Sequence, residues 1–166
     1  MTILVVHPRE NRAKCSLEPL RGRADVRFVK FTLKAASALE LELHLGRDYV
    51  RLAVDGEPLS ERDAAKGIVL LDGNWRFAGA MNRAFAQVPS RSLRGFKTAY
   101  PRTAKLRTDP EEGLASIEAL YIANSILGRP TGGLLDGYHW RDPFLAANPW
   151  PRRSGAPLTP RAAPPA

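Results

Sequence analysis

The stretch Gly67-Ile-Val-Leu-Leu-Asp-Gly-Asn-Trp75 decides the fold class of this chain. Its apolar run predicts a buried strand that ends in an acid, Asp72, and the Gly-Asn pair predicts a turn. Trp75 stands where the next helix should begin. A carboxylate at the end of a buried strand can accept hydrogen bonds from an amino group or a base edge, and an indole can receive a flat ring or a sulfonium cation. These residues therefore predict the floor of a binding pocket.

Strands and helices alternate on both sides of this stretch. Alternating or continuous apolar residues predict strands, whereas periodic apolar residues and capping signals predict helices. The predicted strands are 2–7, 26–31, 49–54, 67–72 and 92–99, and the predicted helical segments are 14–20, a brief one opening at Ser60, 75–87, 114–127 and 142–147. This order of elements indicates an α/β fold with a mostly parallel sheet.

The composition is that of one globular domain. With 166 residues, of which 44% are hydrophobic, the chain can bury a core. No apolar run approaches the roughly 18 residues that span a bilayer, and the run 2–7 is too short for a signal peptide, so we expect no membrane contact. The single Cys15 fits a reducing, cytoplasmic location. The three histidines (His7, His44 and His139) offer no metal spacing, so we expect no metal site.

The chain is strongly basic, with a net charge of +8 and a pI near 10.1. Three of these charges lie in a C-terminal tail without acids, so the body keeps a net charge of +5. Arginine predominates over lysine, and its planar fork suits phosphate and base contacts. The charge favours a nucleic-acid partner, and a solvated basic surface is the alternative.

The sequence lacks the glycine-rich fingerprints of nucleotide-binding enzymes and the Gly-x-Ser-x-Gly elbow of hydrolases. Candidates for chemistry are Asp72, Trp75 and Glu118, which interrupts the apolar helix 114–127. An arginine-rich stretch follows Trp75, and the candidates for nucleic-acid contact within it are Arg83, Arg91, Arg94 and Arg102.

Together these residues resemble the DTW-domain transferases and the ribosomal RNA aminocarboxypropyltransferases. Residues 71–75, Leu-Asp-Gly-Asn-Trp, are similar to the Asp-x-x-Trp signature, and residues 114–120 to the helix with Ser and Glu-Ala. Lys14-Cys15-Ser16 resembles the Lys-Cys-Thr motif of the ribosomal branch, and residues 134–148 resemble its C-terminal segment. These four motifs lie in family order within residues 3–148. The loop at 100–102 differs from the corresponding loop of the ribosomal branch. This difference bears on which RNA is the target more than on the chemistry.

The resemblance implies a SPOUT-like fold, in which a mostly parallel sheet with a C-terminal trefoil knot binds S-adenosylmethionine. It implies an α/β cofactor-binding domain at 1–105 and a small helical C-terminal segment at 106–148 that completes the pocket. The composition of residues 149–166, rich in Pro and Arg, separately predicts a disordered tail. The resemblance also implies transfer of the 3-amino-3-carboxypropyl group to a uridine-type base in rRNA or tRNA, leaving methylthioadenosine, by a monomeric enzyme.

The resemblance also implies roles for the cofactor-site residues. Asp72 would hold the cofactor's amino group or assist deprotonation of the uracil nitrogen, with helix capping as the alternative. Trp75 would wall the pocket or pack in the core. Ser16 would bond the cofactor's carboxylate or ribose, or cap a turn.

The remaining predicted cofactor residues are Leu71, Ser116 and Glu118; the last two could instead form a polar helix N-terminus. Two other functions stay open at this point. One is an RNA methyltransferase of the same fold, and the other is a non-catalytic RNA-binding module in ribosome or tRNA maturation.

Overall fold

The structure, a computed structural model, describes residues 1–10, 12, 15–37, 39, 48–73, 75–101 and 113–149. For Trp75 and Arg76 it describes the backbone alone. Except for Pro149, the predicted tail at 149–166 therefore lies outside the described residues.

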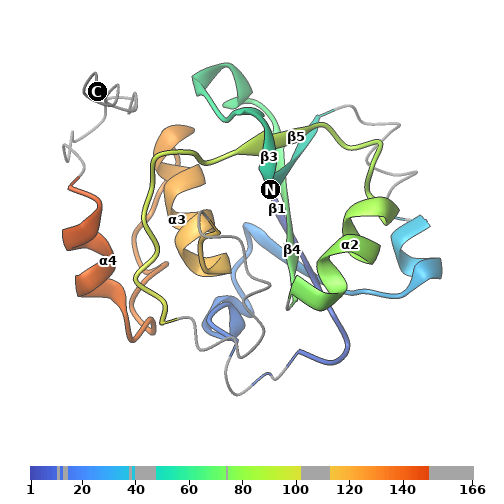
Figure 1. Ribbon diagram of the computed structural model, residues 1–166, viewed down its shortest axis with the longest axis horizontal. Coiled ribbons are helices and arrows are strands. Elements are labelled where there is room, and N and C mark those ends of the chain that lie inside the picture. Colours follow the sequence, from blue (N-terminus) through green and yellow to red (C-terminus); the bar gives the residue numbers. More distant parts are fainter. Residues whose placement is uncertain are drawn as a thin grey trace.

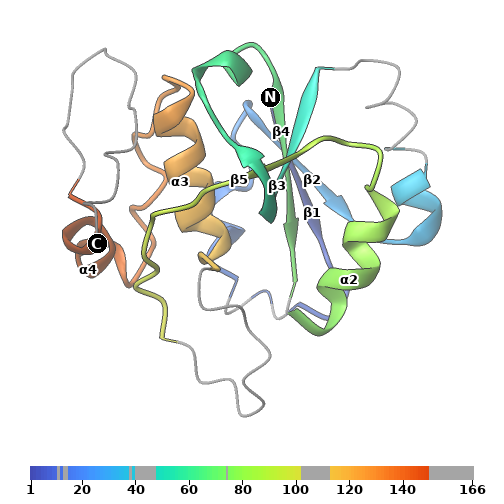
Figure 2. The ribbon, with the colours of Figure 1, turned by 45° about the horizontal axis from the view of Figure 1, so that its top comes forward.

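A five-stranded parallel sheet forms the centre of the molecule (Figure 1, Figure 2). Its order is β2-β1-β4-β3-β5, and every neighbouring pair is parallel. The strands are β1 (Thr2–Val6), β2 (Val26–Lys30), β3 (Tyr49–Pro58), β4 (Gly67–Asp72) and β5 (Ser90–Ser92). The predicted α/β class with a mostly parallel sheet is confirmed.

Both faces of the sheet are covered, which explains the continuous apolar run of β4. Ile68 and Leu70 face one hydrophobic core, and Val69 faces the other, because successive side chains alternate along a strand. Helix α3 (Ser116–Ile126) covers the first face, and helix α2 (Trp75–Ala84) covers the second (Figure 2). Each fully buried Ile or Leu side chain stabilises the fold by roughly 1.5–3 kcal/mol.

Several helices are shorter than these two. The 3-10 helices η2 (Glu18–Leu20) and η3 (Glu61–Asp63) lie close to the predicted helical turns, and α4 (Arg141–Ala147) lies where 142–147 was predicted. Asp63 accepts a hydrogen bond from the Ser60 N–H at 3.4 Å, which is the predicted capping contact. Helix α3 matches the predicted helix 114–127, shortened at both ends.

The predicted strand 92–99 is wrong. Strand β5 ends at Ser92, and Gly95, with a φ of +86°, lies in a turn. The chain then leaves the sheet and runs alongside α3 (Figure 1). Residues 92–99 alternate as a strand would. However, residues 97–99 form hydrogen bonds with groups on α3 and after α4 instead of with a neighbouring strand.

Strand β3 also differs from the prediction, because it continues through the Asp55-Gly56 pair to Pro58. Gly56 has a φ of +108°, and a Cβ there would lie 2.5 Å from the Ser90 hydroxyl. The pairing with β5 shifts register between Leu52 and Glu57. The glycine therefore makes an irregularity inside the strand instead of a turn at its end.

Among the described residues, none of the helices has the length and apolar character needed to cross a membrane.

Candidate active site

The candidate site lies where the strand connections change direction. The chain leaves β1 towards β2 at one edge of the sheet, and it leaves the adjacent β4 towards β5 at the other edge. In open parallel sheets ligands bind in the crevice at the carboxyl ends of two such strands. His7 follows β1 and Asp72 ends β4, and the His7 N–H donates to the Asp72 carbonyl at 2.8 Å.

The Asp72 side chain joins three segments that are distant in sequence. It points to the α3 face because it lies two residues after Leu70. Its Oδ1 accepts a hydrogen bond of 2.6 Å from the Ser116 hydroxyl, at the first residue of α3. Its Oδ2 accepts one of 3.2 Å from the Cys15 thiol. With 8% of its surface exposed, Asp72 is a buried, oriented carboxylate.

No cation neutralises Asp72 within the described part of the chain. Its two side-chain partners, Ser116 and Cys15, are both uncharged donors. Burial, reinforced by the charge of Asp72, raises the pKa of the Cys15 thiol to about 12, so the thiol keeps its proton. The arrangement leaves a partly desolvated negative charge for an incoming ammonium, sulfonium or N–H group.

An aromatic cluster lies on the opposite face at the same strand ends. The His7 ring stacks on Phe77 of α2 at 3.9 Å with an interplanar angle of 7°, and Phe31 lies at 6.0 Å. The Arg9 guanidinium is 5.8 Å from the Phe77 ring centre. Burial and the Arg9 charge lower the pKa of His7, which favours the neutral imidazole. Leu71 packs on this face, away from the Asp72 carboxylate.

Glu118 is fully buried and accepts four hydrogen bonds. The donors are the Thr98 hydroxyl (2.6 Å), the N–H groups of Ala99 and Ala115 (both 2.9 Å) and the Tyr138 hydroxyl (3.0 Å). Its two oxygens therefore connect the start of α3 to the chain after β5. Through these bonds Glu118 positions the backbone beside the site.

Asn148, directly after α4, holds the preceding part of the same segment. Its side-chain amide accepts from the Lys97 N–H and donates to the Lys97 carbonyl, both at 2.8 Å. Residues 97–99 are thus fixed from two sides, by Glu118 and by Asn148. Sequence reasoning missed this double hydrogen bond, because Asn148 and Lys97 are 51 residues apart.

The other predicted cofactor residues are only partly described. Ser16 is half-buried in the turn beside Cys15. Trp75 begins α2, and its side chain lies outside the described residues. The structure brings Asp72 and Ser116 into contact, and it places Leu71 on the opposite face.

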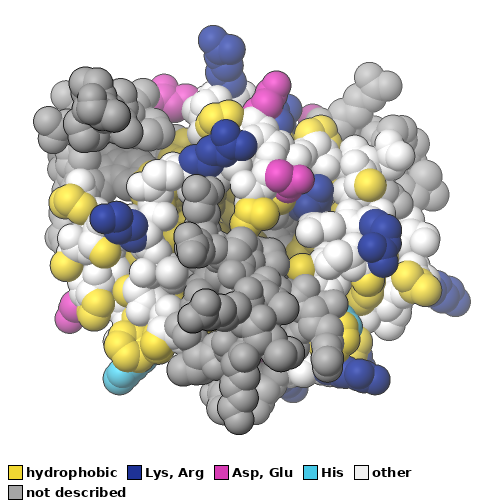
Figure 3. Space-filling view, in the orientation of Figure 1, with side chains coloured by type: hydrophobic (Ala, Val, Ile, Leu, Met, Phe, Trp, Pro, Cys, Tyr) yellow, Lys and Arg dark blue, Asp and Glu magenta, His cyan; other side chains and the backbone are white. Residues whose placement is uncertain are grey.

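The predicted RNA-binding arginines differ in their surroundings. Arg83 and Arg94 are exposed, and Arg102 lies outside the described residues. In the view of Figure 3, the Lys and Arg side chains are dispersed among acidic and uncharged ones.

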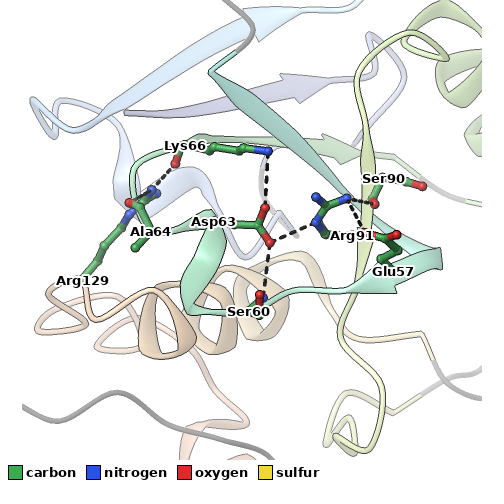
Figure 4. Close-up of polar contacts among 8 residues, drawn as sticks. All are labelled: Glu57, Ser60, Asp63, Ala64, Lys66, Ser90, Arg91 and Arg129. Carbon is green, nitrogen blue, oxygen red and sulfur yellow. Dashed lines mark hydrogen bonds and ion pairs between the residues drawn. The ribbon is translucent and has the colours of Figure 1, made fainter.

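Arg91 lies in an ion-pair network with carboxylates (Figure 4). Its guanidinium bonds the buried Asp63 at 3.0 Å, approaches Glu57 at 3.7 Å and donates to the Ser90 carbonyl at 3.0 Å. Burial alone would raise the pKa of Asp63, but hydrogen bonds from Arg91 and the Ser60 N–H outweigh it and lower that pKa. Most of the Arg91 charge is therefore compensated within the protein.

The same region is tied to α3 by Arg129, which donates to the carbonyls of Ala64 and Lys66 (Figure 4). No group of three or more His, Cys, Asp and Glu side chains in the described ranges could hold a metal ion.

Comparisons with known proteins give one structural relationship. No protein-family profile and no curated protein sequence matches the chain. Among solved structures, the chain is similar to the SAM-dependent rRNA:acp-transferase Tsr3 from Vulcanisaeta distributa, with a TM-score of 0.64 and 19% sequence identity. The match covers 89% of this chain and 78% of that chain. At this identity the two proteins share a fold.

Proposed function

We propose that this chain is an S-adenosylmethionine-dependent transferase that moves the 3-amino-3-carboxypropyl group to a uridine-type base in rRNA or tRNA. The observation that carries the proposal is the oriented Asp72 carboxylate at the strand-end crevice of a fold shared with the acp-transferase Tsr3. The resemblance of residues 71–75 and 114–120 to that class of enzymes supports the same conclusion.

The residues at the site fit a cationic cofactor. Asp72 has two uncharged partners, so its negative charge attracts the ammonium or sulfonium of S-adenosylmethionine. Ser116 lies within hydrogen-bond distance of the same carboxylate, and Ser16 lies in the adjoining turn. We assign the cofactor site to these three residues together with Trp75 and the backbone at Leu71. In this assignment Glu118 acts by positioning the chain at 97–99.

When bound, S-adenosylmethionine supplies an electrophilic carbon of its amino-acid arm and leaves as methylthioadenosine. The protein's contribution is to decide which of the three carbons on the sulfonium meets the nucleophile. Two tasks are then open to Asp72. It can hold the cofactor's amino group, or it can accept the proton that the uracil ring nitrogen loses as its bond to carbon forms.

The proposal includes a SPOUT-like knot and a monomer, both from the family resemblance, and a cytoplasmic location, which the single Cys15 favours. A methyltransferase of the same fold would use the same cofactor, so the released nucleoside tests the proposal directly. Purified protein is incubated with unmodified rRNA transcripts, tRNA transcripts and S-adenosylmethionine, and the products are separated chromatographically. We expect methylthioadenosine in an RNA-dependent amount. If adenosylhomocysteine forms instead, the reaction is methyl transfer. If neither product forms, the result favours a non-catalytic RNA-binding module.

A further inference from the structure

The N-terminal part of this chain contains a strongly basic segment. Residues 9–34 carry eight Lys and Arg against three Asp and Glu, a net charge of +5. Residues 35–149 carry fourteen of each and are neutral overall. Within this part the arginine-rich stretch is also basic, because residues 76–107 carry eight Lys and Arg and no Asp or Glu, and acids elsewhere in 35–149 balance its charge. However, Arg91 of this stretch is paired with Asp63, and Arg102 lies outside the described residues.

This basic segment surrounds the edge strand β2. Strand β2 ends the sheet order, and it follows the loop that brings Cys15 to Asp72. We call its exposed basic residues the β2-edge surface; they are Arg9, Arg12, Arg21, Arg27, Lys30 and Lys34. The surface therefore begins at the candidate site and continues along the outer strand.

Lys30 connects the β2-edge surface to the site geometrically. Val6 pairs in register with Lys30 on one side and with Asp72 on the other, so the three residues form one row across adjacent strands. In-register residues of parallel strands point to the same face. With about 4.8 Å between strands, the Cα atoms of Lys30 and Asp72 lie about 10 Å apart.

Arg21 forms a flat cationic platform further along this surface. Its guanidinium lies 4.2 Å from the ring centre of Phe28, which is on the same face as Lys30. A stacked guanidinium keeps its outer face open for a nucleic-acid base. Arg21 and Arg12 share one carboxylate, Glu18, at 2.7 and 2.5 Å, so a positive charge remains in excess.

We propose that the β2-edge surface binds the sugar-phosphate backbone of the RNA substrate and leads the target base to Asp72. The proposal rests on the proposed RNA-modifying function and adds the path of the RNA to it. Phosphate contacts fix the register of a nucleic acid on a protein without reading its sequence. Lys30 is the residue that sets the distance between the bound backbone and the reacting base.

Three double variants test this path, each of which removes two positive charges from exposed residues. Lys30→Gln/Lys34→Gln changes the β2-edge surface, and Arg83→Gln/Arg94→Gln changes the arginine-rich stretch. Arg62→Gln/Arg141→Gln is the matched control elsewhere on the surface. RNA affinity is measured for fluorescently labelled, unmodified rRNA and tRNA transcripts at several salt concentrations. Cofactor affinity is measured by calorimetry, and thermal melts confirm folding.

We expect Lys30→Gln/Lys34→Gln to lower the slope of log K against log salt by about 1.4–1.8 and to weaken binding roughly 10- to 20-fold near 0.15 M salt. Cofactor affinity should be unchanged, and the control should match the wild type.

Equal losses in all three variants, or a loss only in Arg83→Gln/Arg94→Gln, would overturn the assigned path and leave the proposed function standing. If the wild-type protein binds the cofactor but no RNA at any salt concentration, the path and the RNA-modifying function both fail.

Discussion

The Ser116 hydroxyl donates a 2.6 Å hydrogen bond to Asp72 across 44 residues of sequence. This contact joins the first turn of α3 to the carboxyl end of β4. It fixes one oxygen of a buried carboxylate, and it leaves Cys15 as the donor to the other oxygen. Among the described residues, the orientation of Asp72 is therefore set by two uncharged groups that are distant in sequence.

Ser116→Ala should reduce transfer without unfolding the protein. A hydrogen bond to a charged group contributes about 1.5–3 kcal/mol, so we expect kcat/KM to fall about 10- to 100-fold. The matched control is Ser125→Ala on the same helix, which removes only a bond to the Tyr121 carbonyl. A variant at Ser116 with wild-type kinetics would show that the orientation of the Asp72 carboxylate by this hydroxyl does not matter for transfer.

Glu118→Gln should destabilise the fold. The new amide would present a donor to a pocket that already contains four donors, so at least one hydrogen bond is lost. We expect the free energy of unfolding in urea to fall by about 2–4 kcal/mol. Asp136→Asn, at an exposed carboxylate, should change it by less than about 0.5 kcal/mol. Equal stabilities of the two variants would contradict the role given to Glu118.

Cys15 should react slowly with alkylating reagents in the folded protein. Because burial and the Asp72 charge raise the pKa of its thiol from 9.0 to about 12, the thiolate fraction at pH 8 should be about 100- to 1,000-fold below that of the unfolded chain. The raised pKa stabilises the fold below pH 9, and this contribution is lost between pH 9 and about 12. Mass spectrometry after iodoacetamide labelling, with and without urea, measures the difference.

Asp72→Asn provides the control for that experiment, because it removes the charge that adds to the effect of burial. Labelling of Cys15 should become faster in this variant. Equal labelling rates in the folded and unfolded wild-type protein would show that the thiol is not held against Asp72.

Arg91→Gln should lower stability and leave RNA affinity unchanged. It removes the partner of Asp63, whose side chain is 4% exposed, so we expect a loss of about 2–4 kcal/mol. Because the pKa of Asp63 is lowered in the folded state, its contribution is present near neutral pH and is lost as the pH falls through that pKa. The loss in Arg91→Gln should therefore shrink in acid.

Urea denaturation at pH 7 and pH 3 measures the effect, with Arg62→Gln on the neighbouring 3-10 helix as the control. A variant that keeps full stability and loses RNA affinity would restore Arg91 to an RNA-binding role.

The sequence predicted the elements whose signal is local. The apolar run before Asp72 forms β4, and the periodic apolar residues of 114–127 form α3. Both elements are buried, and burial requires apolar side chains at these positions. The path of residues 92–99 was predicted wrongly. Whether such a segment pairs in a sheet depends on Glu118 and Asn148, which are distant in sequence.

The candidate site was predicted in part for the same reason. Asp72 was recognisable because it comes at the end of a predicted strand. His7 follows β1 in the same way, but it was not selected as a site residue. Two further features depend on strand order and register. Arg91 is paired with a carboxylate, and Lys30 lies in one row with Asp72. Neither can be read from the spacing of charges along the chain.

The most direct test of the account follows the fate of the cofactor's two carbon groups. Wild-type protein and Asp72→Asn are incubated with unmodified rRNA and tRNA transcripts and with S-adenosylmethionine labelled either in the methyl or in the carboxyl carbon. We expect RNA to acquire label only from the carboxyl position, and Asp72→Asn to lose most of this transfer. Label only from the methyl position would contradict the proposed reaction, and undiminished carboxyl label in Asp72→Asn would contradict the central role of Asp72.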